Sequence, residues 1–346
     1  PRVPCPPSLP PPPSAPPSQP PIPPEALPVW STFPAPRYTA VTPIPPPFGR
    51  LALPDGTRVL ALVGLDSTTP FTGRGDAILM VIYHPRLSKA SLVSVPPDLF
   101  GYLPGFGMQR LSSAYALGGG ALLRDTLEYN LGLRPDDWLV AHLDDFANVV
   151  DELGGIVVPV LGPFPLLCDD ILSPGEVFMT GAQAVCYARL RFGEDEAARG
   201  LRQQTLLRQL LLRLVQSGNL LRLPELYQTF HSMADTSLTT RDVLDSAGLL
   251  LKLGDPNRVA YFQMGKGETA IWKISDQPPA TVFIPRRGPI AGMLQRAIEF
   301  ANQPLPLSDV VVTLEYEMTV SPTPTIVPTR TPRPTATDTP VFTATS

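Results

Sequence analysis

Proline is the feature that most constrains this chain, because it crowds into the first fifty residues and the last thirty. The sequence has 46 prolines, and proline lacks the amide donor that helices and central strands need. Neither end can therefore carry a continuous regular element, and we expect both to be disordered. We predict a Pro-rich stalk over residues 1–50, one domain over residues 51–303, and an extension with a Thr/Pro-rich tail over residues 304–346.

Composition limits what the folded part can be. The chain has 346 residues, of which 43% are hydrophobic, enough for a sizeable core. A net charge of -4 gives no general attraction to phosphate backbones, so we expect no nucleic-acid partner. The sequence has no run of eighteen or more apolar residues, the length that a membrane-spanning helix needs. Because the chain starts at Pro1 without methionine, we expect that a signal peptide or anchor has been removed.

Hydrophobic periodicity predicts strands that alternate with helices. Apolar runs rich in β-branched residues predict strands over residues 58–66, 77–85, 89–97, 138–143, 156–160, 259–264 and 269–275. Helical spacing of apolar residues predicts helices over residues 121–132, 144–155, 201–218, 239–254 and 288–300. Asp144 or Asp145 should cap the second of these helices. The pattern indicates an α/β protein, a layered α-β-α domain with a central mixed sheet.

The three cysteines, Cys5, Cys168 and Cys186, leave the redox compartment open. Cys186 lies in the apolar run AVCYA, which is typical of a buried thiol. A disulfide between Cys168 and Cys186 is the alternative, since spacing alone cannot say whether the two side chains approach each other.

Charge is concentrated in the segment GLDSTTPFTGRGDAILMV. Asp66 follows one predicted strand, and Arg74 and Asp76 precede the next. Two carboxylates at neighbouring strand ends suit a hard cation such as Mg²⁺, which proteins hold by one or two acids together with substrate phosphate oxygens. In the alternative interpretation, Asp66 caps a turn and Asp76 pairs with Arg74.

Cationic residues gather in the segment YARLRFGEDEAARGLRQQTLL. Arg189 and Arg191 share a face if the segment is extended, whereas Arg199, Arg202 and Gln203 share one if it is helical. Guanidinium groups bind phosphate oxygens in pairs and stay charged, which suits a pyrophosphate. Alternatively, the acidic cluster Glu194, Asp195 and Glu196 neutralises them in a solvated ion-pair network.

Six blocks in this order resemble the LytR-CpsA-Psr family, also called the cell envelope-related transcriptional attenuator domain, over residues 57–302. They are Gly64-Leu65-Asp66 with Arg74-Gly75-Asp76; Ser94-Val95-Pro96-Pro97-Asp98; Arg110-Leu111-Ser112-Ser113-Ala114-Tyr115 with Gly118-Gly119; Val150-Asp151-Glu152-Leu153-Gly154-Gly155; Tyr187-Ala188-Arg189-Leu190-Arg191; and Arg199-Gly200-Leu201-Arg202-Gln203-Gln204.

The resemblance implies a transferase that moves a glycopolymer from a polyprenyl-pyrophosphate carrier to an acceptor glycan of the cell envelope. It implies an apolar channel for the lipid and a charged mouth that uses Mg²⁺. It also implies an extracytoplasmic protein that meets the membrane surface through its lipid substrate. The residues implied are Asp66 and Asp76 for the metal and, with Arg189 and Arg191, for catalysis; Arg74, Arg110, Arg199, Arg202 and Gln203 for the pyrophosphate; and Asp98 or Glu196 as general base.

The chain departs from the family pattern where it would lose positive charge. Pro97 and Thr68 stand where arginines are usual, and Glu194 and Glu196 stand where aspartates are common, while Arg110 keeps the charge of a lysine. A non-catalytic protein that binds polyprenyl phosphate, or one that associates with the wall, is therefore the alternative. Transcription control, which the family's regulatory name suggests, is disfavoured by the acidic balance.

Overall fold

A computed structural model describes the folded part of the chain. It describes residues 33–34, 43–66, 73–162, 164–167, 170–172, 174–190, 196–216, 219–231, 234–276 and 279–304. One compact unit ends at Gln303. Most of the predicted stalk and nearly all of the predicted tail lie outside the described residues, so their expected disorder stays a prediction.

A mixed sheet of six strands forms the centre of the molecule, in the order β11-β6-β1-β2-β3-β12. β1 pairs antiparallel with β2 and parallel with β6, while β3 pairs antiparallel with β2 and parallel with β12. The strands are β1 (Arg58–Leu65), β2 (Gly75–His84), β3 (Lys89–Val95), β4 (Phe100–Leu103), β5 (Gly107–Arg110), β6 (Asp137–His142), β7 (Ile156–Val160), β8 (Phe164–Leu167), β9 (Asp170–Leu172), β10 (Gly175–Met179), β11 (Ala234–Thr236), β12 (Val259–Gln263), β13 (Thr269–Asp276) and β14 (Pro279–Pro285).

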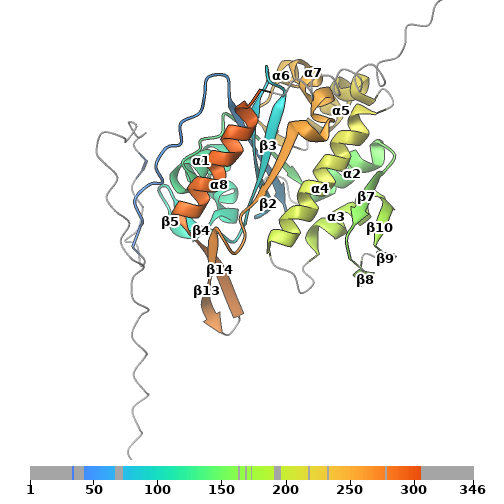
Figure 1. Cartoon of the computed structure of the whole chain (residues 1–346). Coiled ribbons are helices and arrows are strands. Elements are labelled where there is room, and N and C mark those ends of the chain that lie inside the picture. The colour runs from blue at the N-terminus through green and yellow to red at the C-terminus, as the bar shows by residue number, and fades with distance from the viewer. Residues whose placement is uncertain are drawn as a thin grey trace, which may run out of the picture. The chain divides into compact units, whose positions relative to one another are not determined.

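Helices cover both faces of this sheet (Figure 1), with α1 and α8 on one side and α2 and α4 on the other. The helices are α1 (Ala114–Leu131), α2 (Leu143–Glu152), α3 (Gly181–Arg189), α4 (Glu196–Val215), α5 (Leu223–Phe230), α6 (Thr240–Asp245), α7 (Ala247–Leu253) and α8 (Arg287–Asn302). The predicted α/β class, with helix layers around a central mixed sheet, is confirmed.

The strands are apolar on both faces because each face is covered. Val59 and Val63 of β1 are buried in the core cluster that contains Leu127 of α1 and Leu294 of α8. Leu62, between them in sequence, lines a cavity on the opposite face, beneath α2 and α4. This alternation follows from the two-residue period of a strand, and the face beneath α2 and α4 retains a cavity.

Two local predictions are wrong in detail. The N-cap of α2 is His142, and Asp145 sits at the third helical position, where its carboxylate accepts from the His142 amide at 3.3 Å. The helix predicted over residues 239–254 is two helices, α6 and α7, which meet at Ser246. Arg189, whose conformation the sequence left open, ends α3.

Helices α2 and α3 pack very closely. The amide of Gly181 donates to the Asp151 carboxylate at 2.7 Å, and a Cβ at Gly181 would overlap the backbone carbonyl of Ala147. Cys186 of α3 is disulfide-bonded, so a free buried thiol is the wrong interpretation. Its predicted pairing with Cys168 stays a prediction, because Cys168 lies outside the described residues.

We predict that Gly181→Ala destabilises the fold by about 1 to 3 kcal/mol, since the added methyl group must push α2 away from α3. Gly292→Ala is the matched control, because the nearest atom to its new methyl group is 3.7 Å away, at the end of the Arg296 side chain. In helix α8 this control should raise stability by about 0.5 to 1 kcal/mol. Urea unfolding measures both changes, and equal free energies of unfolding for the two variants would contradict the account.

Candidate functional site

A β-bulge shapes the edge of the sheet where the predicted acids lie. Gly64 of β1 pairs with Ala77 of β2, but Leu65 pairs with Gly75, so Asp76 is skipped by the register. A bulged residue leaves the regular ladder, and its side chain and carbonyl can turn toward other partners. The bulge therefore presents Asp76 to the helices that pack beside β2.

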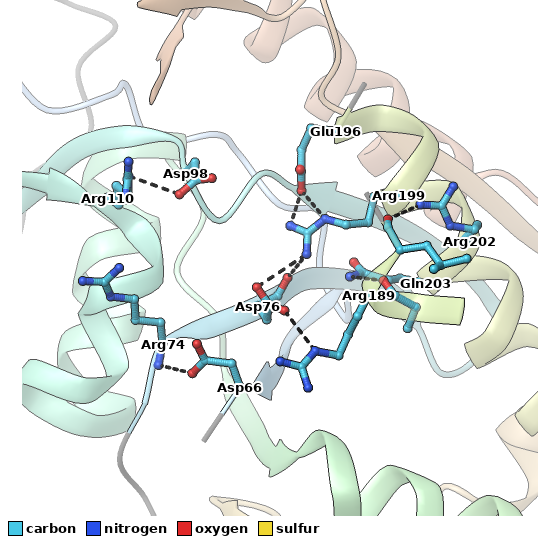
Figure 2. A network of polar contacts seen from close by, with 12 residues as sticks. Asp66, Arg74, Asp76, Asp98, Arg110, Arg189, Glu196, Arg199, Arg202 and Gln203 are labelled. Carbon is cyan, nitrogen blue, oxygen red and sulfur yellow. Dashed lines mark hydrogen bonds and ion pairs between the residues drawn. The ribbon is translucent and has the colours of Figure 1, made fainter. Parts of the chain in front are cut away.

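Arg199 of α4 contacts Asp76 at this bulge. Its Nη1 lies 3.6 Å from Asp76 Oδ1 and donates to the Asp76 carbonyl at 2.9 Å. Its Nε donates to Glu196 Oε1 at 2.9 Å, and its Nη2 bonds the same oxygen. The Arg199 side chain is only 2% exposed, and a buried guanidinium needs such partners to offset its desolvation. Arg199 therefore fixes Asp76 in place (Figure 2).

Arg189 brings a second guanidinium to the same carboxylate from helix α3. Its Nε lies 3.9 Å from Asp76 Oδ2, and its side chain is 50% exposed. Because the Arg189 side chain is already half exposed, it can contact a ligand without leaving a buried position. The structure thus brings together Asp76, Glu196, Arg189 and Arg199 from β2, α3 and α4.

Asp66 and Arg74 close the segment between β1 and β2. Asp66 Oδ1 accepts from the Arg74 amide at 2.8 Å, and the Asp66 amide donates to the Arg74 carbonyl at 3.1 Å. The turn-capping interpretation of Asp66 is therefore confirmed. Figure 2 shows the Asp66 and Asp76 carboxylates between the side chains of Arg74 and Arg189.

The donor set at this edge fits magnesium. In the part of the chain that the structure describes, no three His, Cys, Asp or Glu side chains group as metal ligands. The bond to Arg74 uses one oxygen of Asp66, and the second carboxylate is that of Asp76. Two carboxylates without histidine or cysteine suit a hard cation that completes its shell with phosphate oxygens.

Arg202 and Gln203 face the packing between α3 and α4. Arg202 is buried, and it donates to the carbonyls of Tyr187 and Leu190. Gln203 Nε2 donates to the Ala188 carbonyl at 3.4 Å. This corrects the prediction that Arg202 faces the pyrophosphate, because the hydrogen bonds of its guanidinium join the end of α3 to α4.

Asp98 and Arg110 form a separate pair. Arg110 Nε lies 3.2 Å from Asp98 Oδ1, and its Nη2 donates to the Thr281 carbonyl at 3.1 Å. Figure 2 shows this pair apart from the group around Asp76. Of the two candidate bases, only Glu196 belongs to that group.

Some predicted residues fall outside the described part. They are Arg191, Thr68, Glu194 and Asp195. Pro97 is described, and it lines a small pocket with Glu196 and Gln203. Pro97 therefore stands beside Glu196 of the ionic group and brings no charge there.

An apolar cavity of about 340 Å³ lies behind the charged residues. Two of its lining residues adjoin the charged group in the chain, because Ala77 follows Asp76 and Ala188 precedes Arg189. Its size is at the low end of the range of about 300–1,000 Å³ found for ligand pockets. The side chains that line it include Leu62, Leu79, Leu139, Leu143, Phe146, Val149, Leu206, Leu207, Leu210, Tyr227 and Phe230.

Helix α5, which supplies Tyr227 and Phe230 to the cavity wall, was missed by the sequence analysis. The available clue was Pro224, which stands in the first turn of the helix, where proline is favoured. Burial raises the pKa of Tyr227, and its hydroxyl donates to the Leu238 carbonyl at 2.7 Å. The Tyr227 hydroxyl is therefore paired and neutral at the cavity wall.

Comparisons with known proteins agree with this geometry. The model of the LytR_cpsA_psr family matches residues 49–275. The regulatory protein MsrR of Staphylococcus aureus (strain COL) is 30% identical over 187 residues, 53% of this chain and 57% of MsrR.

Two further proteins are similar. The polyisoprenyl-teichoic acid–peptidoglycan teichoic acid transferase TagU of Bacillus licheniformis is 27% identical over 190 residues, 53% of this chain and 61% of TagU. The chain thus spans little more than half the length of MsrR or TagU. A solved structure of TagT bound to LIIa-WTA has a TM-score of 0.59 at 19% identity, over 72% of this chain and 92% of TagT, which shows a shared fold.

Substitutions of Arg199 and Arg189 should differ in their effect on the free energy of unfolding. Arg199→Met leaves the carboxylates of Asp76 and Glu196 without their shared cation, and we expect a loss of roughly 2 to 4 kcal/mol in the free energy of unfolding. Arg189→Met removes a half-exposed guanidinium and should cost less than about 1 kcal/mol. Denaturant unfolding followed by circular dichroism measures both. If Arg199→Met were as stable as the parent, Arg199 would not organise the site.

Proposed function

The chain belongs to the LytR-CpsA-Psr family, and on that premise we propose that it is an extracytoplasmic glycopolymer transferase. Its donor is a glycan linked to polyprenyl pyrophosphate, and its acceptor is a glycan of the cell envelope. The observation that carries the proposal is that residues lining the apolar cavity adjoin charged ones in the chain, since Ala77 follows Asp76 and Ala188 precedes Arg189. A prenyl diphosphate has the same two parts, an apolar chain joined to a concentrated negative charge.

The cavity suits the lipid portion. Its lining contains leucine, valine and phenylalanine side chains from β1, β2, β6, α2, α4 and α5, so an isoprenoid chain gains the free energy of leaving water. The diphosphate then emerges beside Asp76, where Arg189 is half exposed. Arg189 and Arg74 would bind phosphate oxygens, while the buried Arg199 positions Asp76 and adds positive charge from beneath.

The reaction would break the phosphoanhydride bond of the donor and form a phosphodiester bond to the acceptor. The acceptor hydroxyl oxygen attacks the phosphorus that carries the glycan, and the bond from that phosphorus to the bridging oxygen breaks. The electron pair leaves on polyprenyl phosphate, and the hydroxyl proton passes to a base, for which Glu196 is better placed than Asp98. Arginines aimed at the developing charge lower the barrier of such transfers. A magnesium ion, held by Asp66 and Asp76, would neutralise further charge on the diphosphate.

The names and ligands of related proteins support the proposal. TagU is named a polyisoprenyl-teichoic acid–peptidoglycan teichoic acid transferase, and TagT was solved bound to LIIa-WTA. The disulfide at Cys186 supports an oxidising location such as the cell envelope. Within the described residues, no helix has the length and apolarity to cross a bilayer.

A second candidate function is the binding of polyprenyl phosphate without catalysis. Pro97 favours it, because this residue lines a pocket beside Glu196 where an arginine would have added one charge. Each charge-assisted hydrogen bond contributes about 1.5 to 3 kcal/mol, so the loss would weaken charge stabilisation in the transition state. Copurified lipid together with no turnover on any acceptor would favour this candidate.

We predict that Asp76→Asn lowers magnesium-dependent turnover of a polyprenyl-pyrophosphate sugar by at least about 100-fold, because it removes one metal ligand and the anion that orients both arginines. Asp245→Asn, an exposed acid in α6, is the control and should keep parental turnover. The assay follows released polyprenyl phosphate by thin-layer chromatography. Equal rates for Asp76→Asn and the parent would refute the proposed role.

The cavity can be tested apart from the chemistry. Ala141 of β6 lines it, and Ala141→Phe should weaken the binding of a fluorescent prenyl phosphate by at least about tenfold, because the ring occupies the space of the lipid. Ala116→Phe places the same ring on the exposed start of α1 and should leave affinity unchanged. Unaltered affinity in Ala141→Phe would place the lipid elsewhere.

A further inference from the structure

The hairpin of β13 and β14 carries three exposed apolar side chains close together. Ile271, Trp272 and Ile274 of β13 are 67%, 44% and 50% exposed. We propose that this hairpin docks on the surface of a lipid bilayer, with these side chains at the boundary between headgroups and acyl chains. The inference rests on the proposed transferase function, since a polyprenyl-linked donor lies in a membrane, and it adds which surface of the protein meets that membrane.

Both faces of β13 are open to solvent. The hairpin is a separate two-stranded sheet, and Figure 1 shows it extending beyond the central sheet. A strand that packs one face on a core exposes every second side chain, yet Ile271 and Trp272 are consecutive and both exposed. Grouped apolar exposure of this kind marks an interaction surface. A bilayer would remove these side chains from water, which the fold itself leaves undone.

The base of the hairpin is fixed to the domain. Val282 of β14 is fully buried, and the Phe283 amide donates to the Asp98 carbonyl at 3.0 Å. The Trp272 ring meets the Phe100 ring edge to face, with their centroids 5.8 Å apart. The exposed side chains are therefore held on an anchored arm, and docking needs no rearrangement of the domain.

The residue types suit the interface of a bilayer. A tryptophan ring has an apolar body and a polar N–H, and it is favoured at the level of the headgroups. Isoleucine side chains gain free energy when they leave water. Lys273 stands between Trp272 and Ile274 in the sequence, and the long stem of a lysine lets its ammonium stay among headgroup phosphates.

Charge around the hairpin favours an anionic membrane surface. Residues 264–287 hold four Lys or Arg and two Asp or Glu, although the whole chain has a net charge of -4. Val157 and Phe178, which pair across β7 and β10, form another exposed apolar group. These two strands contain Glu176 and neither lysine nor arginine, so anionic headgroups would repel that group.

The hairpin begins beside the charged group of the candidate site. A Cβ on Gly265 would lie 3.4 Å from the Ala197 Cβ, and Ala197 follows Glu196 in α4. The Met264 amide donates to the Ser94 carbonyl at 3.2 Å, at the end of β3. Docking through the hairpin would therefore hold the charged edge near the headgroups, where the diphosphate of a membrane lipid lies.

The first test is the flotation of the full chain with vesicles of phosphatidylcholine and phosphatidylglycerol that contain no prenyl lipid. Ile271→Gln combined with Ile274→Gln should lower the partition coefficient by at least about tenfold, because two apolar side chains no longer enter the bilayer. The matched control is Leu221→Gln with Leu244→Gln, which changes two exposed leucines outside the hairpin and should bind as the parent does. No binding by the parent, or equal binding by the hairpin variant and the control, would overturn the proposal.

The second test follows Trp272 itself. Lipids brominated on their acyl chains should quench the tryptophan fluorescence of the parent. Trp272→Phe keeps an aromatic ring beside Phe100 and should lose most of this quenching. Equal quenching in both proteins would mean that another part of the chain enters the bilayer. A dimer in solution that Ile271→Gln with Ile274→Gln dissociates would also overturn the proposal, because a second copy would then cover the hairpin.

These results are separate from the proposed chemistry. Vesicle binding that needs the hairpin, in a chain that turns over no donor, upholds the docking surface while the transferase fails. Turnover of a detergent-dissolved donor by a chain that does not bind vesicles overturns the docking surface and leaves the transferase intact.

Discussion

The rest of the site depends on one buried guanidinium. Arg199 is 2% exposed and bonds the Asp76 carbonyl, the Asp76 carboxylate and Glu196 at once. The Asp76 carbonyl at the bulge in β2 accepts from Arg199, and the guanidinium would be a buried charge without the acids. Neither part is stable alone, so the sheet edge and the start of α4 are fixed relative to each other before any substrate arrives.

The fixed edge of the sheet places apolar and charged side chains at neighbouring positions. The apolar cavity lies on the sheet face beneath α2 and α4, and the charged group lies where β2 meets α3 and α4. Consecutive residues serve both, since Asp76 and Ala77, or Ala188 and Arg189, turn one side chain to charge and the next to the cavity. A ligand with an apolar chain and an anionic head matches this arrangement.

The sequence predicted the strands of the central sheet except β11, because the hydrophobic period of a strand is a local signal. It also indicated the residues of the charged group, because arginine and aspartate side chains are the ones that bind phosphate and metal ions. It failed where distant contacts decide. Arg202 differs from Arg199 by one helical turn, yet packing turns it to the carbonyls of Tyr187 and Leu190. The N-cap of α2 is His142 and not Asp145. The apolar pattern of α5 was too short to be recognised. The bulge at Asp76 depends on strand register, which only the paired partner reveals.

The most direct test of the central claim is mass spectrometry of the lipid extracted from the protein after purification in mild detergent. The account predicts that an isoprenoid phosphate or diphosphate is retained close to one molecule per chain. Recovery of no isoprenoid, or of isoprenoid alcohols and phosphorylated lipids in equal measure, would contradict it, because the cavity and the charged group would then not act on one ligand.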